Sequence, residues 1–133
     1  MRMGENEKVI YKELSYTLNG ILFAVHNELG RFRSEKEYCD CIEKHLNDLL
    51  VNYEREKALP PSFEGELARR NIVDFLIQDK IILEVKAKRI LERVDYYQVK
   101  RYSSALNKKL AVLVNFQQKY LTPKRILNSF ASE

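Results

Sequence analysis

Three polar residues, Asp74, Glu84 and Lys86, have the types and spacing that could support chemistry in this 133-residue chain. They lie in a stretch, 71–88, that is rich in β-branched and aromatic residues and is broken by the polar triplet 78–80. Two such runs, each too short for a helix, predict the strands of a β-hairpin. The faces of the hairpin depend on strand alignment, because a one-residue shift moves a strand's whole set of side chains to the other face.

The hydrophobic pattern distinguishes two alignments. A two-residue loop at Asp79-Lys80 would place apolar residues of the first strand on one face with Glu84 and Lys86, which would bury charge. A three-residue loop, 78–80, instead gives one face that is wholly apolar. That face comprises Val73, Phe75, Ile77, Ile81, Leu83 and Val85. The opposite face comprises Ile72, Asp74, Leu76, Ile82, Glu84 and Lys86. Asp74 then lies across from Glu84, with roughly 5 Å between their Cβ atoms.

Two facing carboxylates destabilise a sheet unless a cation lies between them. Carboxylate and carbonyl oxygens are the ligands that hard divalent ions prefer, so we expect Asp74, Glu84 and the backbone carbonyl of Val85 to hold Mg²⁺ or Mn²⁺. Lys86, on the same face, could orient the attacking water or neutralise charge on a phosphate. The simpler interpretation is a solvated Glu/Lys face of an amphipathic sheet. The position of Asp74 across from Glu84 favours the metal site over this simpler interpretation.

The chain after the hairpin is basic. Residues 86–109 contain eight lysines and arginines against two acidic residues, whereas the whole chain has a net charge of only +4. A basic surface beside a metal site suits the phosphodiester backbone of nucleic acid, although basic helix faces also serve solubility. The predicted nucleic-acid contacts are Lys88, Arg89, Arg93, Lys100, Arg101 and Tyr102. Tyr102 would stack on a base, or would instead belong to the core.

The elements that position these residues follow from periodicity and caps. A helix is expected over 7–29, and a second from the capping box of Ser34 and Glu37 to about Leu50. A strand over 51–59 precedes the hairpin, and a helix over 93–106 leads to a buried strand at 110–116, which the helical crossover could pair in parallel with an earlier strand. For the end of the chain, Thr122-Pro123 favours a short helix, but we expect a strand over 124–127. The prediction is one α/β domain, 1–133, with a central mixed sheet flanked by helices.

Composition excludes several classes of protein. The apolar share is 45% and the charged share 32%, as in soluble globular proteins. No apolar run approaches a membrane span, and the first residues lack a signal-peptide core, so a cytoplasmic protein with no membrane partner is expected. Cys39 and Cys41, two apart on a predicted helix, cannot readily bridge. With only two histidines, a structural zinc site is not expected either.

The order of these motifs resembles a known family. An Asp at a strand centre, a loop and then Glu-x-Lys on the next strand resemble the PD-(D/E)xK nuclease superfamily, and the wider pattern resembles its GxxExxY branch. The further matching residues are the run 25–30 (Val-His-Asn-Glu-Leu-Gly), Glu35, Tyr38, Gln98 and Tyr102. The similarity runs from about Leu14 to Leu127. Phe32 stands where the branch has its Gly, and Val73 where the superfamily label has Pro.

The resemblance implies a restriction-endonuclease-like core and metal-dependent hydrolysis of phosphodiester bonds in DNA or RNA. It also implies that Gln98 approaches the site and that Glu35 points toward the two carboxylates. The alternatives are that Gln98 bonds a sheet edge and that Glu35 is a first-turn acid favoured by the helix dipole. For the whole chain, the rival hypothesis is a nuclease-fold module that binds nucleic acid or a protein partner without turnover. A third hypothesis is a homodimer that forms through the basic helix.

Overall fold

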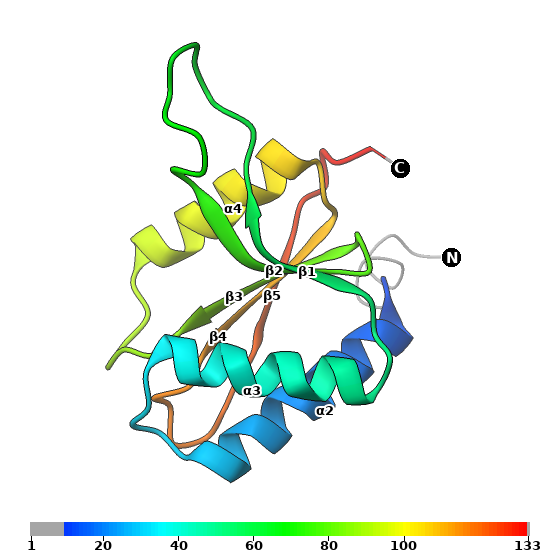
Figure 1. The fold of residues 1–133 in the computed structure, drawn as a ribbon, viewed down its shortest axis with the longest axis vertical. Coiled ribbons are helices and arrows are strands. Elements are labelled where there is room, and N and C mark those ends of the chain that lie inside the picture. Colours follow the sequence, from blue (N-terminus) through cyan, green and yellow to red (C-terminus); the bar gives the residue numbers. More distant parts are fainter. Residues whose placement is uncertain (1–9, 133) are drawn as a thin grey trace.

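Five strands form one sheet in the computed structural model, which describes residues 10–132 (Figure 1). The strands are β1 (Tyr53–Ala58), β2 (Ile72–Ile77), β3 (Ile81–Lys86), β4 (Leu110–Asn115) and β5 (Lys124–Leu127), and they lie side by side in that order. Neighbouring strands are antiparallel except β3 and β4, which are parallel. Because a parallel pair needs a crossover, the chain passes through α4 (Arg93–Leu106) between them. The mixed α/β sheet flanked by helices is the predicted fold class.

Helices cover both faces of the sheet. The antiparallel pair α2 (Lys12–Leu29) and α3 (Glu35–Asp48) lies on one face, and α4 lies on the other (Figure 1). Each face has its own hydrophobic core. The larger core joins α2 and α3 to the sheet through side chains such as Leu22, Tyr38 and Phe75, and the smaller one joins α4 to it through Val99, Leu113 and neighbours. None of the described helices is long and apolar enough to cross a membrane.

The boundaries of α2 and α3 differ from the predicted ones. The first helix begins at Lys12 rather than residue 7, after Tyr11 in a left-handed conformation (φ 52°), and 7–9 lie outside the described residues. The second ends at Asp48 rather than Leu50, because Leu50 is also left-handed (φ 58°). Its predicted start is confirmed, since Ser34 and Glu37 form a full capping box.

The strands confirm two further predictions. Residues 110–115 run parallel to β3, as the crossover suggested. The end of the chain forms a strand, β5, antiparallel to β4, so the alternative of a short helix after Thr122-Pro123 is wrong. Burial of Ile126 in the core on the α4 face explains the preference for a strand.

The hairpin has the predicted three-residue loop. Ile77 is paired with Ile81 and Phe75 with Leu83. One part of the predicted face pattern is wrong: Val73 packs in the core on the α4 side, away from Phe75 and Ile77 on the α3 side. The alternation of side chains is therefore broken at Asp74, the residue between Val73 and Phe75.

Candidate active site at the open end of the hairpin

The two predicted acids lie where β2 and β3 separate. The backbone pairing of these strands runs from Ile77–Ile81 to Phe75–Leu83. Beyond it, the backbone N–H of Asp74 donates to Glu84 Oε1 at 2.9 Å, and the N–H of Val85 donates to Asp74 Oδ2 at 2.7 Å. Each carboxylate therefore takes a hydrogen bond from the opposite strand, as a backbone carbonyl would in a regular ladder. The two acids are brought together as the alignment predicted.

One oxygen of each carboxylate is not used in these two hydrogen bonds. Asp74 Oδ1 and Glu84 Oε2 have no hydrogen-bond or ion-pair partner among residues 10–132. Every buried side-chain oxygen or nitrogen in that part of the chain has a partner. The two remaining oxygens must therefore touch solvent. Neither acid forms a salt bridge in that part of the chain, so one oxygen of each carboxylate remains unpaired.

The electrostatics of the pair are unfavourable without a cation. Glu84 is only 4% exposed, and burial, with a further contribution from the charge of Asp74, raises its pKa to about 8. Burial also raises the pKa of Asp74, although the hydrogen bond from the Val85 N–H opposes this. Lys86 lowers the pKa of both carboxyls, but by less than burial raises it. Such a pair favours either a shared proton or a bound cation.

The backbone on the other side of Asp74 is strained. Glu56 of β1 lies between the paired residues Arg55–Phe75 and Lys57–Val73, and its φ is 56°. A non-glycine residue in the left-handed region costs free energy, and such residues gather at functional sites. The irregularity coincides with the break in side-chain alternation at Asp74.

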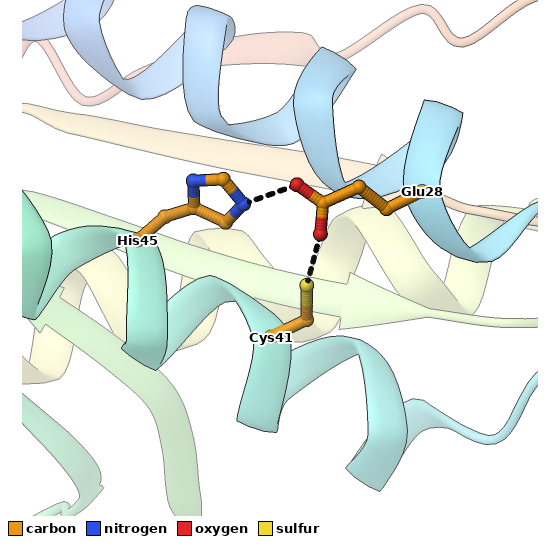
Figure 2. Close-up of side chains that lie close together, drawn as sticks. All are labelled: Glu28, Cys41 and His45. Carbon is orange, nitrogen blue, oxygen red and sulfur yellow. Dashed lines mark hydrogen bonds and ion pairs between the residues drawn. The ribbon is translucent and has the colours of Figure 1, made fainter.

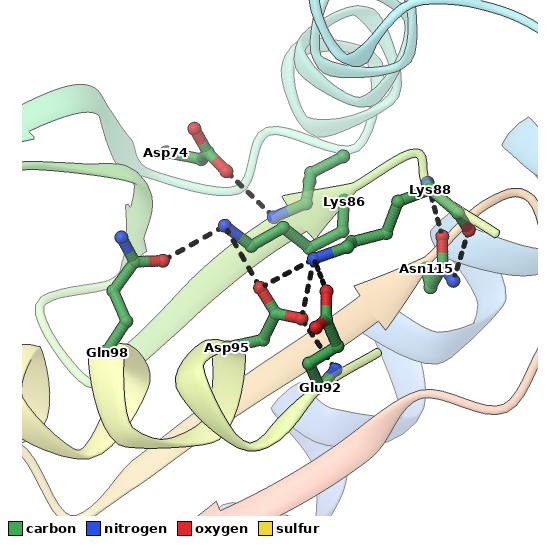
Figure 3. A network of polar contacts seen from close by, with 8 residues as sticks. Asp74, Lys86, Lys88, Glu92, Asp95, Gln98 and Asn115 are labelled. Carbon is green, nitrogen blue, oxygen red and sulfur yellow. Dashed lines mark hydrogen bonds and ion pairs between the residues drawn. The ribbon is translucent and has the colours of Figure 1, made fainter. Parts of the chain in front are cut away.

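Lys86 and Gln98 meet beside the acids. Lys86 Nζ donates to Gln98 Oε1 at 2.9 Å and lies 4.0 Å from Asp95 Oδ1 (Figure 3). Gln98 comes from α4, whereas Lys86 ends β3. The crossover helix thus fixes the position of the lysine ammonium. Gln98 lies next to the site, as the resemblance implied, and it contacts the lysine.

Asp95 is the residue of this region that the sequence analysis missed. It is 5% exposed, accepts from the Glu92 N–H at 2.8 Å and pairs with Lys88 Nζ at 3.0 Å (Figure 3). Burial alone would raise its pKa, but the hydrogen bond from Glu92 and the charge of Lys88 hold the pKa below its usual value. The signal was the spacing Glu92-x-x-Asp95 before an amphipathic run, which forms a capping box at the start of α4.

Glu35 lies near the pair without joining it. It is exposed and is the first residue of α3. Its charge adds to the raised pKa of Asp74 and Glu84, although burial is the larger cause for both. However, the three acids do not form a tight cluster: in the described chain, the metal-ligand groups found within 4.8 Å of one another are a different set.

The predicted nucleic-acid contacts fall into two groups. Arg89, Arg93, Lys100 and Arg101 are exposed. Lys88 instead forms ion pairs with Glu92 and Asp95, so less positive charge faces solvent than the sequence count indicated. Tyr102 is 4% exposed and packs in the core on the α4 face, with the Arg101 guanidinium 5.5 Å from its ring centroid. The prediction that it stacks on bases is wrong, because a buried ring offers no free face.

A comparison with protein families agrees with this arrangement. A sequence model of the PD-(D/E)XK nuclease superfamily matches residues 12–126. The match begins at the first residue of α2 and ends within β5, so it includes both acids and the crossover helix. Searches of the curated proteins and of the solved structures each found no match.

Proposed function

Because this chain belongs to the PD-(D/E)XK nuclease superfamily, we propose that it hydrolyses phosphodiester bonds of DNA or RNA with Mg²⁺ or Mn²⁺ at Asp74 and Glu84. The observation that carries the proposal is the reciprocal pair of hydrogen bonds between the two acids and the opposite strands. It holds two carboxylates together while leaving one oxygen of each without a hydrogen-bond partner. Within the superfamily, we assign the chain to the GxxExxY branch on the residues that resemble it.

The donor set suits a hard divalent ion. Asp74 Oδ1 and Glu84 Oε2 supply two oxygens, and we propose the Val85 carbonyl as the third protein ligand. Mg²⁺ and Mn²⁺ prefer oxygen ligands, and Mg²⁺ takes few protein ligands because it retains water. A bound cation would also offset the burial of charge, and the repulsion from Asp74, that together raise the pKa of Glu84. When bound, the ion would supply Lewis-acid stabilisation of the charge that develops on the phosphate.

Residues of the chain would position the attacking water and the phosphate. Lys86 brings an ammonium to the site, where it can position the attacking water or stabilise negative charge. Gln98 holds that ammonium by a 2.9 Å hydrogen bond, and Asp95 lies on its other side. We assign Gln98 and Glu35 as positioning residues, Gln98 through Lys86 and Glu35 through its charge near the acids. The exposed Arg89, Arg93, Lys100 and Arg101 would contact backbone phosphates.

The test is a cleavage assay with matched variants. The purified protein is incubated with Mg²⁺ or Mn²⁺ and with plasmid DNA, linear duplex, single-stranded DNA or RNA. We expect cleavage of at least one substrate, loss of cleavage with a chelator, and loss in Asp74→Asn and Glu84→Gln. Glu54→Gln is the matched control, because Glu54 is an exposed acid on β1.

Two results would count against the proposal. Cleavage that survives both substitutions would assign the activity to another site or a contaminant. Binding of nucleic acid with no cleavage and no divalent-ion affinity would favour the alternative of a binding module that retains the nuclease fold.

A further inference from the structure

A second group of metal-ligating side chains lies between α2 and α3, outside the candidate active site. Glu28 is in the last turn of α2, and Cys41 and His45 lie four residues apart on one face of α3 (Figure 2). Glu28 Oε1 is 2.9 Å from His45 Nε2, and Cys41 Sγ donates to Glu28 Oε2 at 3.3 Å. One oxygen, one nitrogen and one sulfur therefore converge on the same point from two helices.

The spacing of these atoms is close to what a tetrahedral ion requires. One ligand atom from each of the three residues can be chosen so that all lie within 4.8 Å of one another. Zn²⁺ binds sulfur at about 2.3 Å and nitrogen or oxygen at about 2.1 Å, so neighbouring ligand atoms of a tetrahedral site are roughly 3.5 Å apart. Small side-chain rotations would suffice, because the helices already hold the three residues in place.

The chemistry of the donors selects a different ion from the one at Asp74 and Glu84. Thiolate and imidazole prefer borderline and soft transition metals such as Zn²⁺, whereas two carboxylates prefer Mg²⁺ or Mn²⁺. We propose that Glu28, Cys41 and His45 form a three-ligand site for Zn²⁺ that fastens α2 to α3, with solvent in the fourth position.

Binding would replace a proton on sulfur by the ion. Without metal, Cys41 is a thiol, because burial and the adjacent Glu28 carboxylate raise its pKa to about 11. Zn²⁺ would displace the thiol proton to solvent, and the two charges of the ion would balance the thiolate and the carboxylate. The ion would therefore convert a hydrogen-bonded Cys-Glu contact into a coordinate link. Proton release on binding is a measurable consequence.

The sequence alone did not predict this site, because two cysteines and two histidines are too few for a usual structural zinc site. Cys41 and His45 are on one helix, but the third ligand is a glutamate from the preceding helix, thirteen residues before Cys41. Only the packing of α2 against α3 brings it into place.

The test uses cobalt as a spectroscopic probe for zinc. Metal-free protein is titrated with Co²⁺, and thiolate-to-cobalt charge transfer and the visible bands of tetrahedral cobalt are recorded. We expect these bands in the wild type, their displacement by Zn²⁺, and loss of the charge-transfer band in Cys41→Ser. Cys39→Ala is the matched control, because Cys39 is buried in the larger core and should not contribute. Glu84→Gln should also keep the bands, which separates this site from the proposed active site.

A second readout is stability. Zn²⁺ in excess should raise the midpoint temperature of unfolding of the wild type by about 5 to 10 °C. Cys41→Ser and His45→Asn should show little of this shift. A folded wild-type protein without the charge-transfer band, or a band of equal intensity in Cys41→Ser, would overturn the proposal. Either result would leave the nuclease proposal untouched.

Discussion

Replacing Glu84 by glutamine should stabilise the metal-free protein at alkaline pH while abolishing cleavage. The side chain is buried and its pKa is raised from 4.5 to about 8, by burial first and by the charge of Asp74 second. Glutamine keeps the oxygen that accepts from the Asp74 N–H but carries no charge. The substitution therefore removes the buried charge without removing the hydrogen bond.

The sign and size of the effect follow from proton linkage. A raised pKa means that the folded state binds the proton more tightly than the unfolded state, so the contribution of Glu84 to stability is greatest below pH 4.5 and is lost as pH rises to about 8. At ~1.4 kcal/mol for each pKa unit, a rise from 4.5 to about 8 corresponds to ~5 kcal/mol. Because Asp74 and Glu84 share this cost, we expect Glu84→Gln to recover about 2 kcal/mol at pH 8.5.

The assay is urea unfolding with a chelator present, at pH values from 5 to 9. The unfolding free energy of the wild type should fall across this range, and that of Glu84→Gln should fall much less. Glu54→Gln, a change at an exposed acid, should follow the wild type. Replacing the chelator by Mn²⁺ should stabilise the wild type at pH 8.5 but not the Glu84 variant. Parallel curves for wild type and Glu84→Gln, or a less stable variant at pH 8.5, would refute the electrostatic reasoning.

Three further predictions concern the residues around the pair. Asp95→Ala should lower the unfolding free energy by about 2 kcal/mol at pH 7, because it removes the cap on α4 and leaves Lys88 with Glu92 as its ion-pair partner. Because the pKa of Asp95 is lowered, this difference in unfolding free energy should shrink below pH 4, and a difference that stays constant with pH would contradict the prediction. Gln98→Ala should slow cleavage by about 10 to 100-fold with little loss of stability, because it releases Lys86; unchanged rates would exclude that role. Replacing both Arg93 and Lys100 by glutamine should reduce the salt dependence of nucleic-acid binding by about 2 in the logarithmic slope for duplex DNA, and an unchanged slope would place the substrate elsewhere.

The sequence was sufficient to predict the regular secondary structure and the pairing of the hairpin strands. The three-residue loop followed from the hydrophobic pattern alone, because only that alignment separates apolar from charged residues. The crossover helix, 93–106, and the parallel strand after it followed from periodicity. Asp74 and Glu84 come directly after the last pair of that alignment, where each carboxylate accepts a hydrogen bond from the opposite strand.

What the sequence could not supply depends on irregular backbone and on contacts between distant elements. The pattern of alternating faces failed at Val73, because the strands separate at Asp74 and Glu56 adopts a left-handed conformation. The early end of α3 likewise depends on left-handed Leu50. In the sequence, Asp95 is one of two acids in a basic segment. Its ion pairs with Lys86 and Lys88 form only because α4 packs beside the end of β3.

The most direct test of the central claim is a crystal soaked in Mn²⁺, with anomalous scattering used to locate the ion. We expect a peak between Asp74 Oδ1 and Glu84 Oε2 that is absent from crystals of Glu84→Gln. Well-ordered carboxylates with no peak between them, or a peak only at Glu28, Cys41 and His45, would contradict it.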